Sequence, residues 1–167
     1  MVKKYDAAVK LRQKNINKEN AKSHLKGYRT DIESQIKKLD LNSDNYTSQL
    51  PSIDEMNQYI DNAEDEQIIS QYKDSANQGM QAILEQAQLQ SDKNTAIAKA
   101  NQHRDNQKRA IDQMLGLSDS DKNDLNNQIN ALVADNSGAI SGTKSNEQIT
   151  SLVADNNAAI EKNYGRC

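Results

Sequence analysis

The sequence predicts an all-α protein built from two tandem three-helix bundles that share one long helix. Only one Pro and six Gly occur in 167 residues, so we expect long helices with few turns. Apolar residues recur at helical steps of three and four, and runs with period two, which would indicate strands, are missing. Similar segments also recur along the chain, which is typical of repeat proteins.

Two repeats are visible, a short one and a long one. Residues 132–140 (LVADNSGAI) return twenty positions later as residues 152–160 (LVADNNAAI). Both copies place apolar residues on one face of a helix, which indicates two similar helices folded back on each other. The long repeat has an offset of roughly 76 to 81 in residue number, with a gap in the second helix. Its matching pairs are 39–44 with 115–120 and 66–70 with 147–151.

The composition limits the kind of core that this chain can build. Apolar residues make up 35%, the mean hydropathy is -0.97, and neither Phe nor Trp occurs. A core of Ile, Leu, Val, Ala and Met suits thin helical bundles better than a thick globular interior.

The first helix is expected from about Lys3 to Leu39. Its apolar stripe is Tyr5, Ala8, Val9, Ala21, Leu25, Tyr28, Ile32, Ile36 and Leu39. Residues 12–20 are polar almost all round, so this stretch is either exposed or part of a junction with a preceding repeat.

The second helix can start in two places, and the residues expected in register on its inner face are Tyr46, Leu50, Ile53, Asn57 and Ile60. A turn at residues 40–44 permits a start at Ser43, but Pro51 must then kink the helix. The alternative start is Ser52, where Ser52 and Glu55 have the spacing of a capping box.

One long helix, shared by both bundles, is expected from about Glu64 to Leu115, because no Pro or Gly interrupts residues 88–108. At 1.5 Å per residue it would extend about 75–80 Å. Its stripe is Ile68, Ile69, Tyr72, Ala76, Met80, Ile83, Leu84 and Ala87, then Ala110, Ile111, Met114 and Leu115. The predicted units are residues 1–88 and 89–164.

The second predicted bundle is completed by two further helices. Gly116 stops the long helix and Ser118 caps the next one, whose core residues are Leu125, Ile129, Leu132, Val133 and Ile140. Residues 141–144 form the next turn. The last helix starts at Ser145, with Gln148 at the capping-box position, and carries Ile149, Leu152, Val153, Ala159 and Ile160.

The charge is uneven, although the net charge of -3 does not favour nucleic acid as a partner. The first thirty residues are strongly basic, whereas residues 40–66 hold eight acids and no Lys or Arg. We expect a basic first helix beside an acidic second helix. The alternative is a polyanion-binding face, for a wall polymer or lipid headgroups.

Residues that could carry metal or nucleophilic chemistry are few and scattered. His24 and His103 are the only histidines, and neither has a His, Asp or Glu four positions away, so we expect no metal site and no catalytic site. Cys167, the only cysteine, has no context for a nucleophile. We interpret residues 165–167 as a tail, either a cloning scar or an attachment handle.

The acidic residues and Tyr5 offer only weak site candidates. The densest acidic patch is Asp54, Glu55, Asp61, Glu64, Asp65 and Glu66. Asp119, Asp121 and Asp124 partly resemble a calcium loop, but its Gly and closing Glu are missing, so helix capping explains them better. Tyr5 beside Lys3 and Lys4 is a weak candidate for base stacking. No glycine-rich phosphate loop is present, so no cofactor is expected.

No membrane insertion is expected, because no run of about 18 apolar residues exists. No signal peptide is present, but Met1 can begin an expressed fragment, so its absence does not indicate the cytosol.

Residues 107–112 (QKRAID) leading into 117–125 (LSDSDKNDL) resemble the helical repeats of giant Gram-positive cell-wall adhesins. The closest type is the staphylococcal extracellular-matrix-binding protein homologue, with relatives in lactobacilli. The resemblance covers residues 100–162 well and 20–90 weakly, because Pro51 and the short second helix depart from the pattern. It implies a secreted, wall-attached rod of many three-helix units. Some relatives bind fibronectin or albumin, but no binding residue transfers to this chain.

The leading hypothesis is therefore a non-enzymatic, monomeric segment of an extended bacterial surface stalk, whose partners are neighbouring repeats of the same chain. The first alternative is a binding module that presents an exposed helical face to a host matrix or serum protein, resembling fibronectin or albumin binders. The second alternative is an intracellular coiled-coil scaffold of spectrin-like shape.

Overall fold

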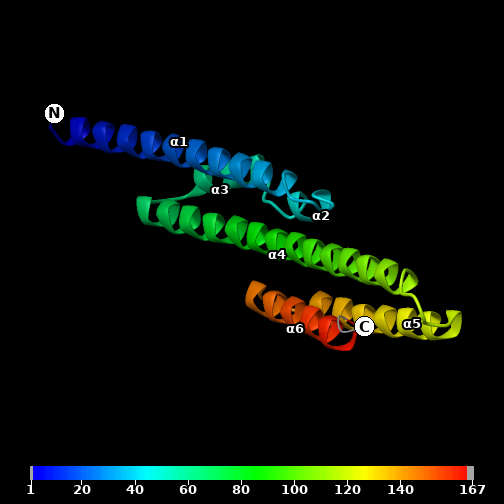
Figure 1. Cartoon of the computed structure of the whole chain (residues 1–167). Coiled ribbons are helices and arrows are strands. Elements are labelled where there is room, and N and C mark those ends of the chain that lie inside the picture. The colour runs from blue at the N-terminus through cyan, green and yellow to red at the C-terminus, as the bar shows by residue number, and fades with distance from the viewer. Residues whose placement is uncertain (1, 165–167) are drawn as a thin grey trace. The chain divides into compact units, whose positions relative to one another are not determined.

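The computed structural model describes the backbone of residues 2–164 and the side chains of residues 4–162. Within these residues the chain forms helices and no strand, which confirms the all-α class. The helices are α1 (Val2–Lys37), α2 (Asp44–Thr47), α3 (Ile53–Asn62), α4 (Glu66–Asp112), α5 (Asp119–Gly142) and α6 (Asn146–Tyr164), as Figure 1 shows. The tail 165–167 with Cys167, and the side chains of Lys3 and Tyr164, lie outside the described residues.

The chain divides into two compact units, Met1–Gln88 (unit 1) and Leu89–Cys167 (unit 2). Helix α4 runs without a break from Glu66 to Asp112 and contributes its first part to unit 1 and its second part to unit 2. No Pro occurs in α4, and Asp65 accepts a hydrogen bond from the backbone of Ile68 at 2.9 Å, which caps the start.

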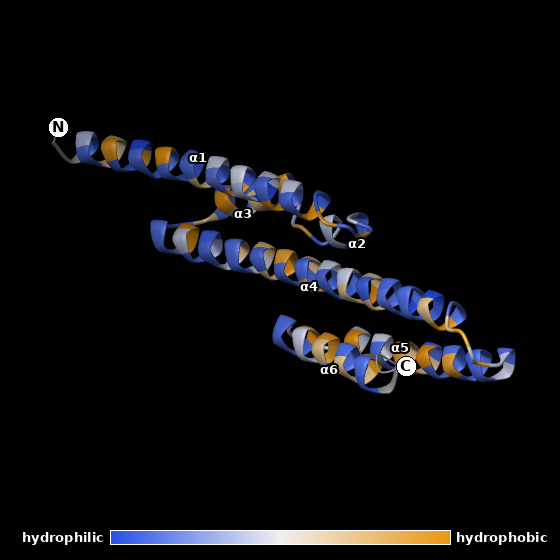
Figure 2. Cartoon of the chain, in the orientation of Figure 1, coloured by the Kyte–Doolittle hydropathy of each residue, from blue (hydrophilic) through white to orange (hydrophobic). Residues whose placement is uncertain are grey.

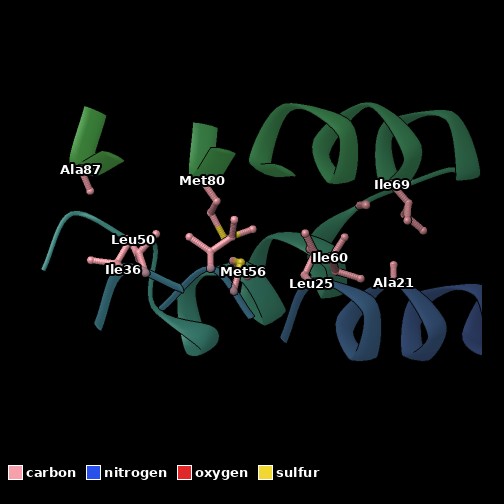
Figure 3. Close-up of a cluster of buried hydrophobic side chains, with 11 residues drawn as sticks. Ala21, Leu25, Ile36, Leu50, Met56, Ile60, Ile69, Met80 and Ala87 are labelled. Atoms are coloured by element: carbon pink, nitrogen blue, oxygen red, sulfur yellow. The ribbon is translucent and has the colours of Figure 1, made fainter. Parts of the chain in front are cut away.

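The core of unit 1 is one apolar cluster, to which α1, α3 and the first part of α4 contribute side chains. Figure 3 shows Ile69, Met80 and Ala87 of α4 directed at side chains from α1 and α3. Its buried members include stripe residues predicted from the sequence. They are Ala21, Leu25, Ile32, Ile36, Leu50, Ile60, Ile69, Met80 and Ala87, joined by Met56 and Ala63.

The second segment of unit 1 is broken at Pro51, and the Ser52 start is confirmed. Helix α2 is a single turn, and α3 begins after Ser52 with a complete capping box. The Ser52 hydroxyl accepts from the Glu55 N–H at 3.2 Å, and the Glu55 carboxylate accepts from the Ser52 N–H at 3.1 Å. Arg29 donates to the Pro51 carbonyl at 2.8 Å, which fixes the connection against α1.

The predicted stripe of the first helix is wrong over its first half. Tyr5 is 72% exposed and Val9 is 50% exposed, and Ala8 is exposed as well. Figure 2 shows apolar residues on this half of α1 among polar ones. The reason is the length of the partners. The bonds from α1 to the end of α3 and to the connection after it begin at Lys14, and every residue before Lys14 whose side chain is described is exposed.

Unit 2 has two separate apolar clusters instead of one. The first is Ala100, Ile111, Ile129, Val133 and Ile160, with Met114, Leu125 and Leu132 packed against it. The second is Ala96, Ile140 and Ile149, with Leu89, Ile97, Leu152 and Val153 packed against it. The predicted core positions of α5 and α6 are thus confirmed except Ala159, which is half-buried and is not among the residues of these clusters. The interruption between the clusters was not predicted.

The end of the long helix lies three residues earlier than predicted, at Asp112. The backbone then tightens, since the Met114 N–H bonds to the Ile111 carbonyl at 3.0 Å, and Gly116 takes a positive φ of 90°. Leu115 is 99% exposed and Ala110 is also exposed. The prediction that these two residues belong to the core is therefore wrong.

The connection between α5 and α6 is shorter than predicted. Helix α5 continues through Gly142, so residues 141–142 are helical and the turn starts at the buried C-cap Thr143. The Ser145 hydroxyl accepts from the Gln148 N–H at 3.4 Å, as predicted. The Gln148 side chain, however, accepts from the Lys144 N–H at 2.9 Å rather than completing a capping box.

The two units repeat the same buried positions. In the first helix of each unit, Ala21, Leu25 and Ile36 correspond to Ala96, Ala100 and Ile111, a constant offset of 75 that we call the first-helix offset. From the end of the second helix onward, Ile60, Ala63, Ile69 and Met80 correspond to Ile140, Thr143, Ile149 and Ile160. This later offset is 80, and we call it the third-helix offset. The offset changes from 75 to 80 within the second helix of each unit. This helix is the unbroken α5 in unit 2, whereas unit 1 has α2, Pro51 and α3 in its place.

Candidate functional site

The basic side chains of α1 contact the end of α3, as expected from the uneven charge. The Lys18 ammonium donates to the Asp61 carbonyl at 2.6 Å, and Lys14 donates to the Glu64 carbonyl at 2.5 Å. Lys22 forms an ion pair with the Asp61 carboxylate at 2.6 Å. Hydrogen bonds from Lys22 to Asp61 and then to Glu19 raise the pKa of Lys22. Lys18 and Lys22 therefore place positive charge at the negative end of the α3 dipole, whereas Lys14 bonds to the connection that follows α3.

Unit 2 repeats this contact at the matching positions. Lys93 corresponds to Lys18 by the first-helix offset, and Ser141 corresponds to Asp61 by the third-helix offset. The Lys93 ammonium donates to the Ser141 carbonyl at 3.0 Å, as Lys18 does to Asp61. Each unit thus ends its second helix with an ammonium from its first helix. The contact between Lys93 and Ser141 was not predicted from the sequence, although the offset of the repeat points to it.

A shallow groove of about 470 Å³ lies between α1 and the start of α4 in unit 1. Its lining is Asn17, Asn20, Ala21, His24, Glu66, Ile69, Ser70 and Lys73. His24 is exposed, stacks against Tyr28 at a centroid distance of 6.3 Å, and has Asn77 Nδ2 3.1 Å from its Nε2. His24 therefore belongs to the contact between α1 and α4.

Unit 2 contains a polar layer in its interior. Asn156 is 3% exposed, and neither its side-chain oxygen nor its nitrogen has a hydrogen-bond partner among the described residues. On α5, Asn136 donates to the Leu152 carbonyl of α6 at 2.8 Å, and its own oxygen has no partner within that part of the chain. His103 is half-buried, and its Nε2 is likewise unpartnered among the residues described.

This layer explains why the core of unit 2 is split. Asn136 and Asn156 occupy the same place in the two copies of the short repeat. By the third-helix offset, they replace Met56 and Ala76, which belong to the continuous cluster of unit 1. The amides therefore lie along α5 and α6 between residues of the two apolar clusters.

An ion-pair triad lies on α1 in unit 1. Glu33 bonds to Arg29 at 2.6 Å and to Lys37 at 2.5 Å, all at helical spacing. These hydrogen bonds, from Lys37 first and then Arg29, lower the pKa of the Glu33 carboxyl. The triad is part of the surface of α1 and stabilises its last turns.

Two tyrosines form a stacked pair that the sequence did not predict. Tyr59 of α3 and Tyr72 of α4 lie with ring centroids 3.8 Å apart. Burial, followed by the nearby Tyr59 and Glu55, raises the pKa of Tyr72. Tyr28, Tyr46 and Tyr72 pack against the unit 1 core, as predicted.

Three of the acidic candidates, Glu55, Asp65 and Asp121, make capping bonds at helix starts. The Asp121 carboxylate accepts from the Ser118 hydroxyl at 2.6 Å and from the Ser118 N–H at 3.3 Å, and so completes a capping box, with Asp119 also in the first turn. Glu55 and Asp65 lie at the starts of α3 and α4 and bond to their first turns. Among residues whose side chains are described, no three His, Cys, Asp or Glu converge as a metal site would require.

Tyr5, the remaining candidate, is exposed beside an exposed Lys4, which leaves the pair on the surface of α1.

Arg104 pairs with Asp105 at 2.8 Å and, through a hydrogen bond, lowers the pKa of that carboxyl. The candidate residues therefore lie in helix caps, in contacts between helices and in the polar layer of unit 2, and not in one common site.

None of the described helices has the length and apolar character needed to cross a bilayer. No protein-family model matches the chain, and searches for similar sequences among curated proteins and for similar solved structures gave no match.

Proposed function

We propose that this chain is a non-enzymatic, structural segment of an extended bacterial cell-surface stalk, made of tandem three-helix bundles. In this proposal, the bundle of unit 1 consists of α1, α3 and the first part of α4. The bundle of unit 2 consists of the second part of α4, α5 and α6. Its partners are neighbouring units of the same polypeptide.

The observation that carries the proposal is the repetition of structural positions at the first-helix and third-helix offsets. Buried aliphatic residues recur at these offsets, as do the lysine caps Lys18 and Lys93. A chain that repeats its core and its caps, with each cluster confined to one unit, is typical of arrays in which each unit resists unfolding separately.

Stretching single molecules tests this mechanical role. The chain would be held through its ends between two marker domains of known unfolding force. We expect two separate unfolding events, each releasing on the order of 200–250 Å of chain, because each unit holds about 75 ordered residues. One event for the whole chain, or extension without resistance, would contradict the proposal.

A matched pair of variants assigns the two events. Ile60→Ala removes a buried side chain of unit 1, and Ile140→Ala removes its counterpart in unit 2. Each should lower the force of one event only, since large-to-small core changes cost about 2–5 kcal/mol locally. If either variant weakened both events, the units would not be mechanically separate.

Attachment to the cell wall is the part of the proposal that rests on the resemblance of residues 107–125. Antibodies against this chain should label intact cells of the source organism, and brief protease treatment of those cells should remove the signal. Detection only after lysis would favour the intracellular scaffold instead.

A further inference from the structure

The first half of α1 presents an apolar face that unit 1 leaves uncovered. We define the α1 face as Tyr5, Ala8, Val9 and Ile16. Tyr5 is 72%, Val9 50% and Ile16 44% exposed, and Figure 2 shows apolar residues on this half of the helix. Exposed apolar side chains at helical spacing normally mark a packing surface.

The register of α4 shows what kind of surface this is. The first-helix offset, which relates Ala21, Leu25 and Ile36 to buried residues of α4, also relates the α1 face to α4. It places Tyr5, Ala8, Val9 and Ile16 at the positions of Met80, Ile83, Leu84 and Ser91. Met80 is fully buried in unit 1, Ile83 and Leu84 pack against the same core, and Ser91 is buried.

Helix α6 supports the same correspondence. Ile149 and Ile160 of α6 correspond to Ile69 and Met80 of α4 by the third-helix offset, and all four are buried. Tyr5, Met80 and Ile160 are therefore equivalent positions on α1, α4 and α6. If α6 continued beyond Ile160 in the same register, its next inward-facing positions would be those that Ala8 and Val9 occupy in α1.

We propose that the α1 face is the last part of the third helix of a preceding bundle, whose other two helices cover it. This inference rests on the proposed tandem architecture and names the partner. The partner is a unit 2 bundle earlier in the same polypeptide, contacting the α1 face through the corner where its α4 leads into α5.

The chemistry of that corner fits the α1 face. Met114 and Leu125 are only half-buried there, and Leu115 is 99% exposed. Asp119, Asp121 and Asp124 supply exposed negative charge at the start of α5. Arg12 is exposed on the α1 face itself, four residues after Ala8 and four before Ile16, so its positive charge is complementary to these carboxylates.

A fusion of two copies tests the register directly. Residues 1–160 are followed by residues 6–167, so that Ile160 of the first copy takes the place of Tyr5 in the second. Cys167 becomes Ser in both the fusion and the single chain, and the only cysteine is Val9→Cys in the second copy. Its rate of reaction with a maleimide reports whether position 9 is covered.

We expect the fusion to react at least tenfold more slowly than the single chain carrying Val9→Cys. Its rate should approach that of a single chain carrying Leu84→Cys, the equivalent position in α4. The matched control inserts two alanines at the joint, which turns the α1 face by about 200° and should restore fast reaction.

Fast reaction in the in-register fusion, or equally slow reaction with the insertion, would overturn the inference. Slower reaction of the single chain on adding fibronectin or albumin would assign the face to a host protein and would equally overturn it. Failure of the inference is distinguishable from failure of the stalk proposal, since two unfolding events can persist while position 9 stays reactive.

Discussion

Single residues decide how continuous each core is. Asn136 and Asn156 stand in unit 2 where Met56 and Ala76 stand in unit 1, and this difference separates two apolar clusters. A buried amide without a partner costs about 1–3 kcal/mol, whereas a buried Asn between helices can fix their register. Because α5 and α6 carry nearly identical segments, a polar layer would help to hold one alignment of the pair.

Transferring the unit 1 residue into unit 2 tests this cost. Asn156→Ala removes both unpartnered polar atoms and should raise the free energy of unfolding of unit 2 by about 1 kcal/mol. Hydrogen exchange of the α5 and α6 amides measures it. Asp155→Ala, at the exposed neighbouring position, is the control and should change it by less than about 0.5 kcal/mol. A loss of stability in Asn156→Ala would mean that the amide is satisfied.

The Glu33 triad predicts a pH dependence confined to unit 1. Hydrogen bonds lower the pKa of folded Glu33 below its unfolded value, so their contribution is present above about pH 4.3 and lost as the pH falls through the folded pKa. Glu33→Gln should therefore reduce the loss of stability between about pH 5 and pH 3. At neutral pH it should cost less than about 1 kcal/mol, because the pairs are partly exposed.

Urea unfolding of unit 1 at several pH values measures this effect. Glu85→Gln is the control, because Glu85 forms no ion pair in the part of the chain that the structure describes. If Glu33→Gln kept the wild-type slope, as the control should, the triad would not contribute to acid sensitivity.

At the scale of elements, helix starts were more predictable than helix packing. Ser52 and Ser118 followed from local capping patterns, because a cap depends on residues only three positions apart. The exposure of Tyr5 and Val9 did not follow, since periodicity shows that a face is apolar but not whether a partner reaches it. Likewise, the contacts of Lys18 and Lys93 join residues more than forty positions apart, so no local pattern reveals them.

Glycines in these helices predict opposite effects according to their backbone. Gly79 lies in the interior of α4 with open space where a Cβ would stand, so Gly79→Ala should stabilise the protein by about 1 kcal/mol. Gly116, with a φ of 90°, should lose about 1–2 kcal/mol on the same change. Thermal unfolding followed by circular dichroism compares the two, and equal shifts would contradict the assigned backbone conformations.

At the scale of the whole molecule, one helix, α4, belongs to two units. The amino-acid pattern indicated this because nothing in residues 88–108 stops a helix, and α4 is continuous there. The same helix carries Met80 of the unit 1 core and Ala100 and Ile111 of the unit 2 core. Transmission of force from one unit to the next would then pass through its backbone hydrogen bonds.

Pulsed electron spin resonance across the boundary tests this claim most directly. Spin labels on Asp74→Cys and Gln102→Cys, both exposed on α4, with Cys167→Ser, report the distance along the helix. An unbroken helix predicts one narrow distribution near about 42 Å, from 1.5 Å per residue. Gln88→Pro, at an exposed boundary position, should broaden it by breaking the helix, and Gln88→Ala should not. A broad or short distribution in the protein without the Pro would contradict a helix shared by two units.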